Sequence, residues 1–129
     1  MKKTILFLFF SSLFLISCNS VKHSDVSGSS SFYIENLSGE TILVSAVLLN
    51  GENVNETMIL PNEVKKILYW VEIGTNPTPE LVFETLTIEN ADSLLLYKQD
   101  PVRNSLWLKK CSNSQNAEYY HSDYYYNYK

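Results

Sequence analysis

Histidine and glycine are scarce in this chain, with two histidines and four glycines among 129 residues. The histidines, His23 and His121, lie far apart in the sequence, so they lack the spacing of metal ligands. Three glycines stand singly in turns and the fourth lies in a serine-rich segment, which excludes a glycine-rich loop that cradles phosphate. The sequence therefore predicts no metal site and no cofactor.

Basic residues are also few, with 10 lysines and arginines against 14 acidic residues and a formal net charge of −4 at pH 7. A net negative charge argues against nucleic acid and against an anionic membrane surface as partners. Any partner of the folded domain is therefore expected to be a protein or a glycan.

Long apolar runs are missing, apart from a short one at the start of the chain. Lys2 and Lys3 precede residues 4–16, which are almost wholly apolar. A transmembrane helix needs about 20 apolar residues, whereas a signal peptide carries about 7–15 of them after a cationic start. Residues 1–17 are therefore predicted to be a signal peptide, with a single membrane-spanning helix as the alternative. Its removal would leave 8 basic and 14 acidic residues, a net charge of −6.

The end of this run resembles a lipobox, the site at which bacterial signal peptidase cuts before a lipid-bearing cysteine. Residues 15–18 read Leu-Ile-Ser-Cys. The resemblance implies a thioether-linked diacylglycerol on Cys18 and an acyl group such as palmitate on its amino terminus. Two or more buried chains give stable attachment, so we expect a protein that is anchored to a membrane without spanning it. A non-lipidated secretory signal with a chance cysteine is the alternative.

The residues around the anchor bear on location and on the second cysteine. Asn19 follows the cysteine, and the resemblance implies the outer membrane if sorting is like that of enterobacteria. Some lipoproteins carry an acidic cluster at this place that directs them to the cell surface; this chain lacks one, so a periplasm-facing position is expected. Lipidation would use the thiol of Cys18, so Cys111 would have no partner for an intrachain disulfide. We expect Cys111 to be buried as a small apolar residue; an intermolecular disulfide or a redox thiol are the alternatives.

Composition divides the rest of the chain in two. Residues 18–31 are rich in serine and nearly devoid of large apolar side chains, which is typical of a flexible coil. They are predicted to comprise the lipidated cysteine and a tether. Residues 32–129 are predicted to form one small domain.

Within this domain, apolar and β-branched segments alternate with turn signals, of which Asn50-Gly51 is the strongest. Further turns are predicted at residues 36–40, 61–63, 74–79, 90–92 and 100–101. Residues 80–82 are expected to add one helical turn at most. The spacing predicts an all-β fold, a single antiparallel β-sandwich of seven to eight strands. A small barrel is the alternative, and the strand order stays open.

Several segments together carry a wider resemblance. They are the lipobox, the serine-rich segment, residues 32–39 (Phe-Tyr-Ile-Glu-Asn-Leu-Ser-Gly), residues 60–64 (Leu-Pro-Asn-Glu-Val), residues 83–88 (Phe-Glu-Thr-Leu-Thr-Ile), the strand with Trp107 and the aromatic C-terminal strand. In this combination the chain resembles small lipoproteins of the Bacteroidetes, over most of its length after the signal peptide. The resemblance implies an Ig-like or transthyretin-like sandwich and supplies no catalytic residues.

The sequence shows no arrangement of nucleophile and base. His121, Ser122 and Asp123 are adjacent, whereas a catalytic triad is assembled from separate positions that converge in the fold. We therefore expect no enzyme but a non-enzymatic binding or structural module of the bacterial cell envelope. A carbohydrate-binding surface lipoprotein and a periplasmic inhibitor or immunity-type protein are alternatives, and an enzyme whose residues converge only in the fold is the competing class.

Tyrosine is concentrated at the C-terminal end, where residues 119–128 hold six of the nine. On an extended strand, alternate residues share a face, and the four tyrosines on one face are Tyr120, Tyr124, Tyr126 and Tyr128. An apolar ring with a polar tip suits sugar stacking or a protein interface, so this row is the predicted binding face. The alternative is that the row packs on the sandwich core.

Overall fold

The structure is a computed structural model that describes residues 27–112 and 120–129. The predicted signal peptide, Cys18 and the first part of the predicted tether lie outside the described residues. The elements are β1 (Ser27–Asn36), β2 (Ile42–Leu48), β3 (Asn53–Ile59), β4 (Val64–Ile73), α1 (Pro79–Val82), β5 (Phe83–Asn90), β6 (Leu95–Gln99), the 3-10 helix η1 (Asn104–Leu106), β7 (Leu108–Ser112) and β8 (Tyr120–Tyr128). Within these ranges, no helix is long and apolar enough to cross a membrane.

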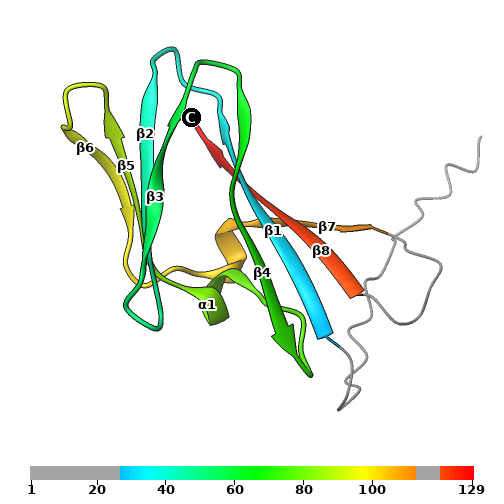
Figure 1. The fold of residues 1–129 in the computed structure, drawn as a ribbon. Coiled ribbons are helices and arrows are strands. Elements are labelled where there is room, and N and C mark those ends of the chain that lie inside the picture. Colours follow the sequence, from blue (N-terminus) through cyan, green and yellow to red (C-terminus); the bar gives the residue numbers. More distant parts are fainter. Residues whose placement is uncertain (1–26, 113–119) are drawn as a thin grey trace, which may run out of the picture.

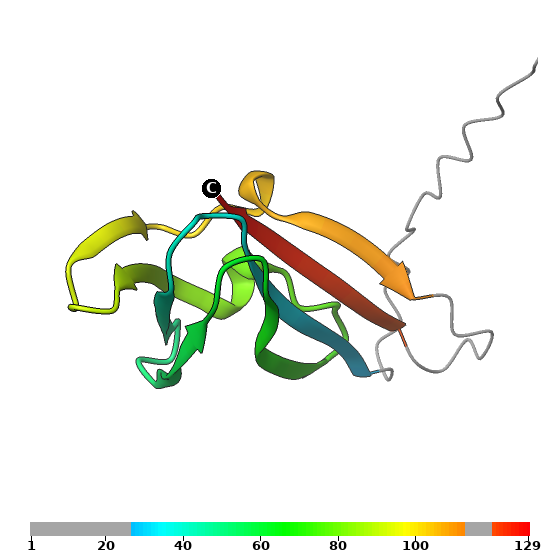
Figure 2. The same ribbon diagram turned by 90° about the horizontal axis from the view of Figure 1, so that it is seen from above.

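The eight strands form two four-stranded sheets, which confirms the predicted β-sandwich. Sheet A has the order β4-β1-β8-β7, and sheet B has the order β3-β2-β5-β6. Figures 1 and 2 show the two sheets as separate layers. The hairpins β2–β3, β5–β6 and β7–β8 each stay within one sheet, and the other connections cross between the sheets.

One strand pair departs from the antiparallel arrangement. Strands β1 and β8 are parallel, with Phe32 opposite Tyr124, whereas the other paired strands are antiparallel. Adjacent strands joined by a short turn must run in opposite directions, but a parallel pair needs a long connection. Because β1 is the first strand and β8 the last, no turn joins them and either direction is allowed.

Strand β1 begins before the predicted start of the domain. Its first residue is Ser27, so the prediction of a flexible tether over residues 27–31 is wrong. Both neighbouring strands pair with this segment: Ser27 lies opposite Ile73 of β4, and Gly28 lies opposite Tyr120 of β8. Serine and glycine contribute little apolar burial, but their backbone groups are paired on both sides of the strand.

The small residues of β1 also have a packing role on the inner side of sheet A. There, the segment before α1 lies against the sheet. Ser30 is buried and its Oγ donates a hydrogen bond of 2.6 Å to the carbonyl oxygen of Pro77. Gly28 lies so close to Asn76 that a side chain at position 28 would overlap the Asn76 amide oxygen. A serine-rich sequence at this place therefore provides space for another segment.

The core is centred on four aromatic rings from different parts of the chain. The ring centroid of Phe32 lies 4.9 Å from that of Phe83, 6.0 Å from that of Trp107 and 5.5 Å from that of Tyr124. The buried Trp107 follows η1 directly, just before β7, and its Nε1 donates a hydrogen bond of 3.2 Å to Oε1 of Gln99. Further buried apolar residues are Ile34, Ile42, Val44, Ala46, Leu48, Ile59, Ile67, Val82, Leu86, Ile88 and Val102.

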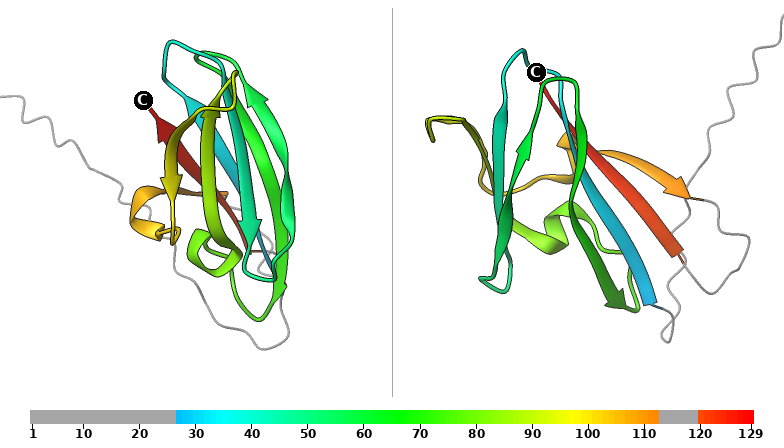
Figure 3. Two further views of the ribbon diagram at one scale, coloured as in Figure 1. Left: turned by 90° about the vertical axis from the view of Figure 1, so that its left-hand side faces the viewer. Right: turned by 45° about the horizontal axis from the view of Figure 1, so that its top comes forward.

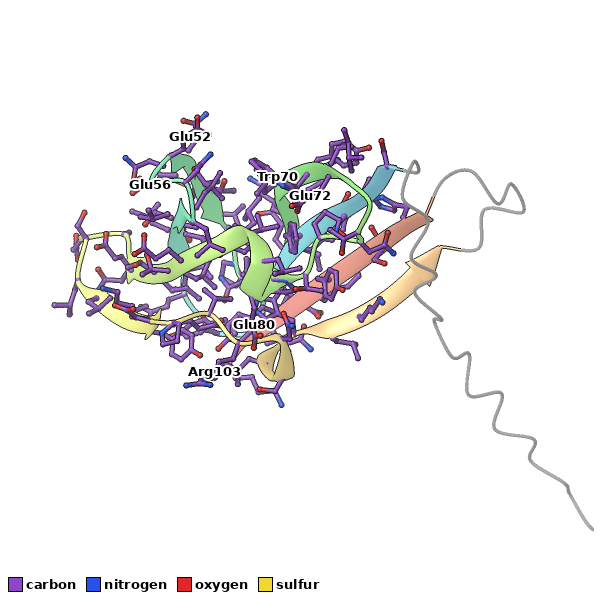
Figure 4. All side chains as sticks on the ribbon, turned by 90° about the horizontal axis from the view of Figure 1, so that it is seen from below. Glu52, Glu56, Trp70, Glu72, Glu80 and Arg103 are labelled. Atoms are coloured by element: carbon purple, nitrogen blue, oxygen red, sulfur yellow. The ribbon has the colours of Figure 1, made fainter. Side chains whose placement is uncertain are left out.

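The sheets spread apart at one end of the sandwich, and α1 lies in the space between them (Figures 1 and 3). This single turn confirms the helical turn predicted at residues 80–82. It is connected to η1 by two reciprocal hydrogen bonds. The backbone N–H of Glu80 donates to Oδ1 of Asn104, and the backbone N–H of Asn104 donates to Oε1 of Glu80, both at 2.9 Å. Figure 4 shows Glu80 beside Arg103, where the connection from β4 to β5 meets the connection from β6 to β7.

Candidate functional site

The predicted tyrosine binding face points into the sandwich. Tyr124 is 4% exposed and stacks on Phe32, so the prediction that it belongs to an exposed aromatic row is wrong. Tyr126 and Tyr128 are half-buried and pack against the core. The backbone of Tyr120 pairs with Gly28, but its side chain lies outside the described ones. The alternative, in which this face of β8 packs on the core, is the correct one for the described side chains.

The two half-buried tyrosines join a cluster between the sheets. The ring of Tyr97 in β6 stacks on Tyr126 with centroids 5.5 Å apart, and it lies 6.3 Å from the ring of Tyr128. Burial raises the pKa of the Tyr126 phenol above its ordinary value, and a hydrogen bond with Tyr97 raises it further. The phenol therefore stays protonated near neutral pH. These tyrosines connect β8 of sheet A with β6 of sheet B.

The outer face of sheet A carries a second aromatic group. Tyr33 of β1 and Tyr125 of β8 are cross-strand partners whose rings stack at 4.7 Å with an interplanar angle of 9°. The ammonium group of Lys110 in β7 lies 4.3 Å from the centroid of the Tyr125 ring, within the range of a cation–π interaction. Burial, followed by the charge of Asp123, raises the pKa of the Tyr125 phenol. The ring of Tyr33 and the ammonium group of Lys110 therefore both contact the ring of Tyr125.

A serine, a histidine and an aspartate come together on the same outer face. Ser29 Oγ lies 2.8 Å from Nδ1 of His121, and Nε2 of His121 lies 2.9 Å from Oδ1 of Asp123. The ring of Tyr69 in β4 stacks beside His121 with centroids 6.0 Å apart. Their positions follow from strand pairing, because Ser29 is opposite His121 in β8 and Asp123 is two residues further along the same face. We call Ser29, His121 and Asp123 the polar cluster.

No protein-family model matches the chain, and no curated protein matches it.

The polar cluster differs from the three adjacent residues considered in the sequence. Ser122 faces the other side of β8, where it is 1% exposed and lies 3.5 Å from Nδ2 of Asn76. The alternation of a strand places His121 and Asp123 on one face and Ser122 on the other. The sequence was therefore sufficient to predict that Ser122 lies apart from the other two. The serine that contacts His121 belongs to a segment predicted to be a tether, and only the pairing of β1 with β8 brings it there.

Other predicted residues lie beyond what the structure describes. Cys18 is outside the described residues, and Cys111 is described in β7 only by its backbone, so the expectation that its side chain is buried stays a prediction. Among the described side chains, no three histidine, cysteine or acidic residues form a group that could hold a metal ion. The polar cluster supplies one imidazole and one carboxylate, and these already bind each other.

Proposed function

We propose that the protein is a lipid-anchored lipoprotein of the bacterial outer membrane, facing the periplasm, whose β-sandwich acts as a non-enzymatic binding or structural module. The observation that carries the proposal is the Leu-Ile-Ser-Cys sequence of residues 15–18 at the end of a short apolar run. The start of β1 at Ser27 supports it, because only residues 19–26 separate the lipidation site from the first strand. A lipid on Cys18 would therefore hold the domain close to the membrane surface.

The position of the polar cluster supports binding rather than catalysis. A serine nucleophile needs free hydrogen-bond donors that stabilise the developing oxyanion, usually backbone N–H groups. Strand β1 has β4 on one side and β8 on the other, and Ser29 pairs with Val71 and His121. The backbone donors around Ser29 are therefore used by the two strand ladders. The cluster instead connects the outer sides of β1 and β8.

The aromatic groups of sheet A favour a protein partner over a glycan. A sugar ring binds an aromatic side chain by stacking on its flat face. The ring of Tyr33 and the cation of Lys110 already lie against the ring of Tyr125, so this ring is less open to a stacking sugar. The tyrosine row of β8 suggested a carbohydrate-binding surface lipoprotein. Because Tyr124 is buried, this row does not form a continuous exposed surface on which sugars could stack.

The anchor is tested by expressing the full-length protein and its Cys18→Ala variant in a bacterial host. We expect the unmodified protein to gain the mass of a diacylglycerol and an acyl chain and to float with membranes, whereas Cys18→Ala loses both properties. Cys111→Ala is the matched control, since it also removes a thiol and should leave mass shift and flotation unchanged. Unchanged cleavage, mass and membrane partitioning in Cys18→Ala would refute the proposed anchor.

The proposal that the domain is not an enzyme is tested with activated ester substrates and the Ser29→Ala variant. We expect the unmodified protein to hydrolyse these substrates no faster than Ser29→Ala, because the two strand ladders use the backbone donors of β1 around Ser29. A rate that depends on Ser29 and falls in His121→Ala as well would place the protein in the competing class of enzymes.

A further inference from the structure

The outward-facing side of β4 presents three large side chains to solvent near the start of β1. Tyr69, Val71 and Ile73 are 53%, 50% and 76% exposed. They alternate along the strand and therefore share one face. We call these three residues the β4 row. Trp70 and Glu72 alternate with them along β4 and therefore lie on the opposite face of the strand.

The neighbours of the β4 row leave at least half of each side chain exposed, although the ring of Tyr69 stacks beside His121. The three residues that pair with it on β1 are Ser31, Ser29 and Ser27. Serine side chains are short, so the larger side chains of the row project beyond them. On its other side β4 is the edge of sheet A. The row itself carries no charge, so it offers no charged group to a partner.

The β4 row lies at the end of the sandwich where the chain from the predicted anchor enters the fold. Ile73 pairs with Ser27, the first residue of β1, at the lower end of sheet A in Figure 1. Residues 19–26 separate Cys18 from Ser27. Because an extended chain covers at most about 3.6 Å per residue, Ser27 can lie no more than about 32 Å from the lipidated residue.

From these observations we propose that the β4 row is a membrane-docking surface that lies in the headgroup region of the lipid layer holding the anchor. This inference rests on the proposed lipidation of Cys18. Its occupant is a zwitterionic phospholipid surface, because the row offers apolar and amphipathic groups but no cation for an anionic lipid. Tyrosine is enriched at membrane interfaces, and isoleucine and valine bury apolar area there.

The anchor makes such weak docking effective. Three side chains would bind a membrane poorly from solution, but a short tether turns docking into an intramolecular event with a local concentration in the millimolar range. Binding of a second copy of the chain at the β4 edge would not be strengthened by the short distance between the row and the anchor. Docking through the β4 row would hold sheet A at the membrane and leave the opposite end of the sandwich, with the β5–β6 hairpin, directed away from it (Figure 1).

The test compares two exposed apolar positions at opposite ends of the sandwich. Full-length lipidated protein with Cys111→Ser carries either Ile73→Cys or Leu94→Cys, since the sulfur of Cys18 is used by the lipid. Leu94 is the matched control, because it is 64% exposed and lies next to β6. Each new thiol receives a small fluorophore, and the protein is reconstituted into vesicles of phosphatidylcholine and phosphatidylethanolamine.

Quenching by aqueous iodide then reports which end is shielded. We expect the quenching constant at position 73 to be roughly threefold lower than at position 94, because groups in the headgroup region are shielded from an aqueous ion. Equal quenching in protein that carries the lipid and floats with the vesicles would overturn docking while leaving the anchor intact. Shielding at position 73 that increases with protein density at fixed lipid would indicate a second copy and would also overturn it. Protein without lipid mass or flotation would refute the anchor and the docking together.

Discussion

Gly28 of β1 lies directly against the backbone of Thr75, and a Cβ atom at position 28 would overlap the carbonyl oxygen of Thr75. Because backbone atoms cannot move aside as a flexible side chain does, Gly28→Ala should lower the free energy of unfolding by about 1–3 kcal/mol, the usual cost of overpacking. Gly39→Ala is the control, since a Cβ there would meet no atom within 4 Å. Urea unfolding of both variants measures the difference, and equal midpoints would contradict the close packing at Gly28.

Adjacent tyrosines of β8 should differ strongly in their contribution to stability. Tyr124 is buried against Phe32, so Tyr124→Ala should cost about 3–5 kcal/mol, the range for removing a large core aromatic. Tyr125 lies on the outer face, and Tyr125→Ala should cost about 0.5–1.5 kcal/mol through loss of its stack with Tyr33. Thermal and urea unfolding would test this order, and a smaller loss for Tyr124→Ala would argue against its place in the core.

The connection between α1 and η1 depends on two side chains that each bind the backbone of the other helix. Removing either one, by Glu80→Ala or Asn104→Ala, should lower the free energy of unfolding by about 0.5–1.5 kcal/mol, the net value of one hydrogen bond. The double variant should lose less than the sum of the two, because either loss frees the remaining partner to move. Additive losses in a double-mutant cycle would show that the two bonds form independently.

Alkaline pH should destabilise the protein through its buried tyrosines. The pKa of the Tyr124 and Tyr126 phenols lies above the ordinary value of 10.0 in the folded protein, mainly through burial. Their contribution to stability is therefore complete below pH 10 and is lost as the pH rises towards the folded-state pKa, since the unfolded chain then releases protons that the folded chain retains. Unfolding free energies measured from pH 8 to pH 11 should fall above pH 10.

The Tyr126→Phe variant supplies the control for this pH dependence. It removes one titrating group while keeping the ring that stacks on Tyr97. The decrease in stability above pH 10 should therefore be smaller in Tyr126→Phe than in the unmodified protein. An identical decrease in both proteins would show that Tyr126 ionises equally easily in the folded and unfolded chains.

The sequence alone determined the elements with regular alternation or strong turn signals. Ile42, Val44, Ala46 and Leu48 alternate along β2, and all four are buried. The predicted Asn50-Gly51 reversal lies between β2 and β3, where Gly51 has a φ of 87°, a conformation that glycine adopts readily. Such features depend on neighbours within a few residues, so a local pattern is sufficient to predict them.

Tertiary structure decided which face of a strand is covered and whether a polar segment is ordered at all. Alternation places Tyr124, Tyr126 and Tyr128 on one side of β8, but only the position of sheet B makes that side the inner one. Residues 27–31 lack apolar side chains, and they are ordered because β4 and β8 pair with their backbone on both sides. The same pairing brings Ser29 to His121 across 92 positions of sequence. Contacts of that separation depend on strand order, which no local periodicity records.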